Sequence, residues 1–167
     1  MKVLAVAALI VAGLSSSAWA DPLDEAMQAF ERDDYAAALV IWRPLADQGN
    51  PRAQTNLGFL YSNGYGVPLD YAEAMGWYLR AAQQGDALAQ GSLGFIYAHG
   101  TGVSRDLVRA YAWSSLAMAG STGALLSLFA ADREAVARQM NEQEGAQARL
   151  LAAELETRIG SQTARTR

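Results

Sequence analysis

Residues 50–85 read NPRAQTNLGFLYSNGYGVPLDYAEAMGWYLRAAQQG, and residues 86–120 read DALAQGSLGFIYAHGTGVSRDLVRAYAWSSLAMAG. The two stretches repeat one another at an offset of 36 residues. The matching positions are Leu57 and Leu93, Gly58 and Gly94, Phe59 and Phe95, Tyr61 and Tyr97, Gly64 and Gly100, Gly66 and Gly102, Asp70 and Asp106, Ala74 and Ala110, and Trp77 and Trp113. A fixed period of this length is typical of a stacked array of helix pairs.

Each repeat predicts a helix, a glycine loop and a second helix. The glycines, Gly64 and Gly66 in the first repeat, suit a turn because a positive φ costs energy for residues with a Cβ. Asp70 stands where the second helix should begin, and Glu73 follows it at the spacing of a capping box. Gly58 falls in the middle of the first helix, which predicts that a neighbouring helix approaches closely there.

The first repeat resembles the Sel-1-like branch of the tetratricopeptide repeats. Ala53 through Gly85 follows the pattern A-x3-L-G-x2-Y-x2-G-x-G-V-x2-D-x3-A-x2-W-Y-x2-A-A-x-Q-G of that family. The second repeat departs from it at Ser114, where an aromatic residue usually follows the tryptophan, and is one residue short before Gly120. The resemblance implies an all-α fold: a right-handed α-solenoid of stacked helix hairpins with a C-terminal capping helix.

Shorter matches extend the array in both directions. Asp34, Ala38, Gln48 and Gly49 align with Asp70, Ala74, Gln84 and Gly85, so residues 21–49 are interpreted as a degenerate unit that lacks the glycine loop. Residues 121–160 are expected to form capping helices, because the end of a stacked array needs a polar outer surface. Gly160 is expected to end the last helix, and residues 161–167 are expected to be disordered.

The first 20 residues have the features of a signal peptide. Lys2 gives the positive start, residues 3–14 the apolar run, and Ala18-Trp19-Ala20 a cleavage site between small residues. The apolar run is too short to span a membrane. We therefore expect export, cleavage before Asp21, and a periplasmic or secreted protein without an integral membrane segment.

Composition argues against several classes of function. The sequence has no cysteine and a net charge of −4, without a basic cluster, which argues against nucleic acid as a partner. His99 is the sole histidine, so no zinc site and no other metal centre is expected. No cofactor-binding motif is present either, because the Gly-x-Gly pairs follow helices rather than strands.

No catalytic constellation stands out, and we predict that the protein is not an enzyme. Ser114 and Ser115 lie inside a predicted helix without a nearby base. The resemblance favours a non-catalytic adaptor of the cell envelope that binds a protein or peptide through the concave groove of the array. Two alternatives stay open: a hydrolase acting on β-lactams or cell-wall material, and a secreted effector.

The candidate peptide-binding residues lie on the first helix of each repeat. Phe59 and its repeat partner Phe95 fall on the side of the helix that should be polar, which suggests aromatic anchors for a ligand. A position in the core between helices explains them equally well at this stage. The full candidate set is Arg52, Thr55, Asn56, Phe59, Asn63, Ser92, Phe95 and His99.

Overall fold

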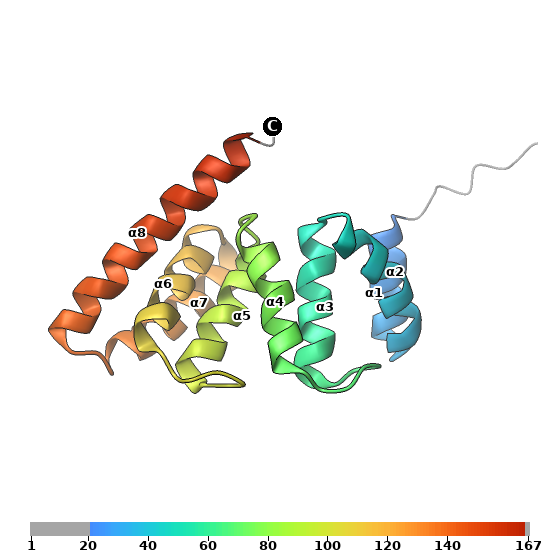
Figure 1. Ribbon diagram of the computed structural model, residues 1–167, viewed down its shortest axis with the longest axis horizontal. Coiled ribbons are helices and arrows are strands. Elements are labelled where there is room, and N and C mark those ends of the chain that lie inside the picture. The colour runs from blue at the N-terminus through green and yellow to red at the C-terminus, as the bar shows by residue number, and fades with distance from the viewer. Residues whose placement is uncertain (1–20, 166–167) are drawn as a thin grey trace, which may run out of the picture.

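The computed structural model describes residues 21–165 (Figure 1). Over that range the chain forms eight helices and no strand. They are α1 (Pro22–Glu31), α2 (Tyr35–Asp47), α3 (Pro51–Asn63), α4 (Tyr71–Ala82), α5 (Ala87–His99), α6 (Leu107–Ala119), α7 (Gly123–Ala137) and α8 (Glu142–Arg165). The predicted all-α architecture is confirmed, whereas the signal peptide of residues 1–20 lies outside the described residues.

The helices stack in chain order into a solenoid. Helices α1 and α2, α3 and α4, and α5 and α6 each form a packed hairpin, and successive hairpins pack on one another through α2 with α3 and α4 with α5. Helix α7 packs against α6 and α5. The long helix α8 runs obliquely across α6 at the far end of the array from α1 (Figure 1), as expected of a C-terminal capping helix.

Aspartates begin the second helix of each hairpin. The side chains of Asp34, Asp70 and Asp106 each accept a hydrogen bond from a backbone N–H in the first turn, which satisfies a donor that the helix leaves unpaired. The capping box predicted for Asp70 is only half formed. The carboxylate of Glu73 instead accepts a hydrogen bond from the indole Nε1 of Trp77 at 2.9 Å, one turn further along the same helix.

The glycine loops reverse the chain as predicted. Gly64 ends α3 with φ 69° and Gly100 ends α5 with φ 69°, both in the left-handed region. Each donates its backbone N–H to a carbonyl of the preceding turn, Leu60 or Ile96. These glycines therefore close the first helix of each repeat with a geometry that favours a residue without a Cβ.

The core is built from two linked clusters. Trp42, Leu57 and Leu60 are fully buried among α1, α2 and α3, and Trp77 of α4 packs with them. Trp113 is buried in the second cluster, which joins α4, α5 and α6 to Leu155 and Ile159 of α8. Both repeat tryptophans, Trp77 and Trp113, therefore fill the space between helices.

The C-terminal end differs from the prediction. Helix α8 continues through Gly160 to Arg165, where the sequence predicted a disordered tail from residue 161 onward. Ile159 is buried, and the hydroxyl of Thr163 bonds back to its carbonyl at 3.1 Å across the glycine. One glycine inside a helix costs about 1 kcal/mol, so it does not end a helix whose next turn is hydrogen-bonded.

Candidate peptide-binding groove

The two repeat phenylalanines lie outside both core clusters. Phe59 on α3 is 42 % exposed and Phe95 on α5 is 56 % exposed. Phe59 is supported from one side by Phe30 and Tyr65, with ring centroids 5.8 Å and 5.9 Å away. Phe95 stacks on the ring of His99 at 4.1 Å. Both rings therefore present an apolar face to solvent while their backs are held by neighbouring rings.

A groove runs between these two phenylalanines. One cavity of about 320 Å³ reaches from α3 across α5 to α7, and a second of about 470 Å³ lies towards the glycine loops. The two share Phe59, Tyr78, Ser92 and Phe95, so they form one continuous depression, hereafter the groove. Apolar side chains line it from three helices, namely Leu88 and Phe95 of α5, Phe59 of α3, and Leu125, Leu128 and Phe129 of α7.

Helix spacing and one glycine explain how the groove is formed. Asn56, Phe59 and Asn63 follow one another at i, i+3 and i+7 and so lie on one face of α3. Gly91 leaves room for the ring of Phe129, because a Cβ there would stand 2.7 Å from its Cζ. Helix α7 therefore sits directly against α5 and forms one wall of the groove.

Polar groups are interspersed with the apolar ones. Asn63 is exposed and its amide donates to the carbonyl of Phe59 at 2.9 Å, while the hydroxyl of Ser92 donates to the carbonyl of Leu88 at 2.9 Å. The hydroxyl of Tyr78 lies 3.3 Å from that of Ser62. Burial raises the pKa of Tyr78 above 10.0, so its phenol is neutral and can donate at neutral pH.

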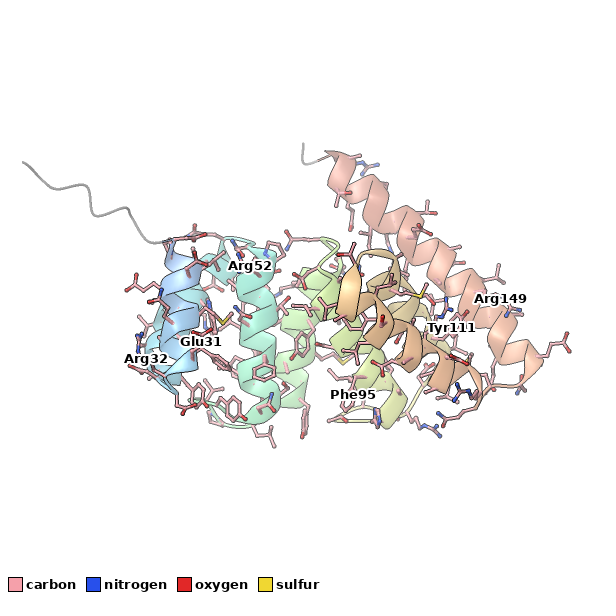
Figure 2. The ribbon with its side chains drawn as sticks, turned by 180° about the vertical axis from the view of Figure 1, so that it is seen from behind. Glu31, Arg32, Arg52, Phe95, Tyr111 and Arg149 are labelled. Carbon is pink, nitrogen blue, oxygen red and sulfur yellow. The ribbon has the colours of Figure 1, made fainter. Side chains whose placement is uncertain are left out.

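Two of the predicted site residues, Arg52 and His99, lie outside the groove, and a third, Thr55, is buried at its border. Arg52 is exposed in the first turn of α3 and does not line the groove; Figure 2 shows it at the opposite end of the helices from Phe95. Thr55 borders the groove but is buried, and its hydroxyl donates to the carboxylate of Asp86 at 3.0 Å. His99 stacks on Phe95 yet lines a separate cavity.

Sequence reasoning missed several groove residues. Leu88 lies on the stripe of α5 that carries Ser92, Phe95 and His99, at i, i+4, i+7 and i+11, so helical spacing alone could have included it. Leu125 and Leu128 follow the last full repeat, where no period indicates which side of the helix faces α5. Tyr78 directly follows the repeat tryptophan Trp77 in the sequence, and its buried ring reaches the groove floor.

Among residues 21–165, no group of three or more histidine, aspartate or glutamate side chains is placed to hold a metal ion. No helix in this range is both long and apolar enough to cross a membrane.

Comparison with known proteins agrees with this architecture. The Sel1 repeat family matches residues 51–86 and 87–119. A protective antigen present in uropathogenic Escherichia coli strains, which displays an SLR fold, is 30 % identical with a TM-score of 0.75; the match covers 86 % of this chain and 31 % of that one. A Sel1 repeat protein from Oxalobacter formigenes is 28 % identical with a TM-score of 0.64, covering 84 % and 59 %.

The chain thus spans less than two thirds of either structure that it matches. No curated protein matches it in sequence. The two family matches coincide with the two hairpins α3–α4 and α5–α6, and the structural likeness extends to the helices on either side. The chain is therefore a Sel1-like repeat protein with two Sel1 repeats, at residues 51–86 and 87–119.

Proposed function

We propose that this protein is a non-catalytic adaptor of the cell envelope that binds a peptide segment of a partner protein in the groove. Sel1 repeat proteins are generally protein-interaction adaptors, and this supports the class of function. The observation that carries the proposal is the exposure of Phe59 and Phe95, one repeat apart, on the two sides of a single groove. Apolar side chains that gather in one groove with polar groups among them often mark a site of protein interaction.

The composition of the groove suits an extended or helical segment with apolar side chains. Phe59, Phe95 and Leu128 offer separate apolar contacts on three helices, and aromatic anchors of this kind often contribute about 2 kcal/mol or more of binding free energy. Asn56, Asn63 and Ser92 stand between them and can bond to the backbone of the segment. The groove therefore combines apolar anchoring with polar groups that fix orientation.

The location in the cell envelope is part of the proposal and rests on residues 1–20. Their charged start, apolar run and Ala18-Trp19-Ala20 support export followed by cleavage. The intact mass of the exported protein tests this step. A mass that starts at Asp21 is expected, and a mass that retains Trp19 would contradict the proposed cleavage site.

Site-specific photocrosslinking tests the groove. A benzophenone amino acid is placed at Phe95 and, as a matched control, at Leu150, which is 67 % exposed on α8 away from the groove. After irradiation in the native envelope fraction, we expect a discrete protein adduct from position 95 and none of that mass from position 150. The same adducts from both positions, or no adduct from position 95, would argue against binding in the groove.

A further inference from the structure

A second cavity, hereafter the polar pocket, adjoins the groove beyond Phe95. Its volume is about 430 Å³, within the usual range for small-ligand sites, and it lies where α5, α6 and α7 meet. Its lining includes Phe95, His99, Arg105, Ser114, Asp132 and Gln139. Because Phe95 lines both depressions, a segment bound in the groove can place one side chain in the polar pocket.

The hydroxyl of Ser114 has no hydrogen-bond partner in the described part of the chain, although its residue is only 3 % exposed and lines the polar pocket. The neighbouring Ser115 shows the usual alternative, because its hydroxyl donates to the carbonyl of Tyr111 at 2.8 Å. The hydroxyl of Ser114 is therefore available to a ligand group that enters the polar pocket, and a hydrogen bond to it would favour binding.

The departure from the repeat pattern accounts for the polar pocket. Tyr78 occupies the corresponding position of the first repeat, and its ring covers Gly58. In the second repeat the small side chain of Ser114 lies against Gly94 instead, which leaves room between α5 and α7. A polar pocket therefore takes the place of the tyrosine ring.

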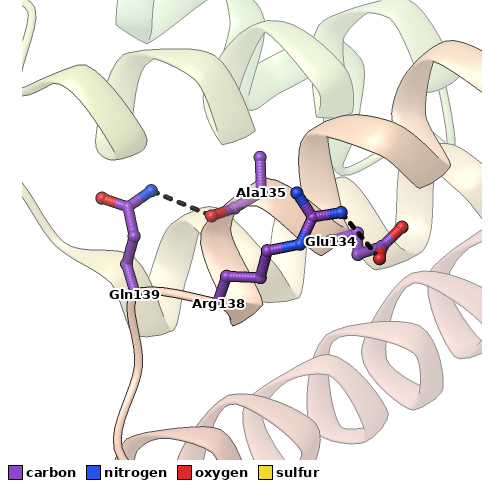
Figure 3. A network of polar contacts seen from close by, with 4 residues as sticks. All are labelled: Glu134, Ala135, Arg138 and Gln139. Atoms are coloured by element: carbon purple, nitrogen blue, oxygen red, sulfur yellow. Dashed lines mark hydrogen bonds and ion pairs between the residues drawn. The ribbon is translucent and has the colours of Figure 1, made fainter.

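The charges of the polar pocket are of opposite sign and are not paired with each other. The guanidinium of Arg105 is held by the carbonyl of Ala98 at 3.0 Å and by the amide oxygen of Gln139. Gln139 is itself fixed, because its amide nitrogen donates to the carbonyl of Ala135 at 2.9 Å (Figure 3). Neither Arg105 nor Asp132 takes part in the ion pairs found in the described residues, Arg109 with Asp106 and Arg138 with Glu134.

We infer that the polar pocket binds the carboxamide side chain of an asparagine or glutamine in the bound peptide; this rests on the proposed function of the groove. A carboxamide carries an oxygen that accepts from Arg105 and an NH₂ group that donates to Asp132, and either can bond to Ser114. A carboxylate in the same place would be repelled by the negative charge of Asp132. An ammonium group there would be repelled by the positive charge of Arg105. The polar pocket therefore selects a neutral group with both a donor and an acceptor.

An NMR titration of the ¹⁵N-labelled protein tests the inference with three probes: the N-acetyl methylamides of glutamine, glutamate and leucine. We expect the glutamine probe to shift the amide signals of Phe95, Arg105 and Ser114 and to bind roughly tenfold more tightly than the other two. Ser114→Ala should weaken the glutamine probe about three- to tenfold and leave Tm unchanged or higher, whereas the control Ser115→Ala should leave binding unchanged. Asp132→Asn should move the preference towards the glutamate probe.

Two results would overturn the inference: equal binding of all three probes, or a lower Tm for Ser114→Ala with unchanged binding of the glutamine probe. The second result would mean that the hydroxyl stabilises the fold. Failure of the glutamine probe to bind while the position-95 crosslink persists would overturn this inference and leave the proposed function standing. Loss of the crosslink while the probe still binds would overturn the proposed function and the claim that a peptide supplies the carboxamide.

Discussion

Gly58 of α3 faces the aromatic ring of Tyr78 of α4 so closely that a Cβ built on the glycine would stand 2.7 Å from both Cδ1 and Cε1 of the ring. Real Cβ atoms essentially never approach another atom that closely. The sequence predicted a close helix approach at this mid-helix glycine, and the contact confirms it. The glycine sets how near α3 and α4 lie, and thereby where the Tyr78 ring meets the groove.

Gly58→Ala should therefore destabilise the protein. The substitution gains about 1 kcal/mol of helix propensity but forces the buried Tyr78 ring to move, at a cost of typically 1–3 kcal/mol. We expect a net loss of about 1 kcal/mol in the free energy of unfolding, measured by urea denaturation. The matched control is Gly76→Ala in α4, where nothing lies within 4 Å of the added Cβ, and a gain of about 0.5–1 kcal/mol is expected. Equal effects of the two substitutions would refute this account of Gly58.

Helix α8 should be part of the folded unit. Leu155 is buried in the second core cluster, so Leu155→Ala should lower the unfolding free energy by about 2–5 kcal/mol. Leu150 on the same helix is largely exposed, and Leu150→Ala should change stability by no more than about 0.5 kcal/mol. Deletion of residues 141–167 should lower Tm and promote aggregation, because it uncovers the apolar side of α6. A deletion variant as stable as the full chain would show that α8 caps nothing.

Alkaline pH should weaken the fold through its tyrosines. Burial raises the pKa of Tyr78, and the hydrogen bond to Asp33 raises the pKa of Tyr35 from 10.0 to about 12. A raised pKa means that the folded state favours the neutral tyrosine. The contribution of that tyrosine to the free energy of unfolding is therefore complete below pH 10.0 and is lost as pH rises through the folded-state pKa. When the free energy of unfolding is measured at pH values below and above 10.0, it should fall more steeply with pH for the wild type than for Tyr78→Phe. Identical slopes would mean that Tyr78 ionises without opposing the fold.

The fold could be predicted from the sequence because repetition and capping are local signals. An offset of 36 residues defines both full hairpins, and the aspartates that open α2, α4 and α6 stand at their predicted places. The extent of α8 could not be predicted in this way. Gly160 resembles a stop signal, but buried Ile159 and the Thr163 hydroxyl carry the helix past it.

The groove could be predicted only in part. Phe59 and Phe95 stood out because an apolar residue on a polar face is unusual, and both are exposed. Thr55 appeared equally polar on the helical wheel, yet its partner is Asp86, the N-cap of α5, which a single helix does not reveal. The contribution of α7 depends on how closely it packs on Gly91, and that is a property of the tertiary structure.

The measurement that tests the central claim most directly compares partner capture and Tm in the double variant Phe59→Ser, Phe95→Ser. The control is Leu150→Ser, which makes the same kind of change on exposed surface away from the groove. Because Phe59 also contacts Phe30 and Tyr65, each aromatic pair lost should cost about 0.5–1.5 kcal/mol, enough to lower Tm by a few degrees. We predict that the folded double variant loses capture of the partner crosslinked at position 95, whereas Leu150→Ser retains it. Wild-type capture by the double variant, or its complete unfolding, would contradict the assignment of these phenylalanines as ligand anchors.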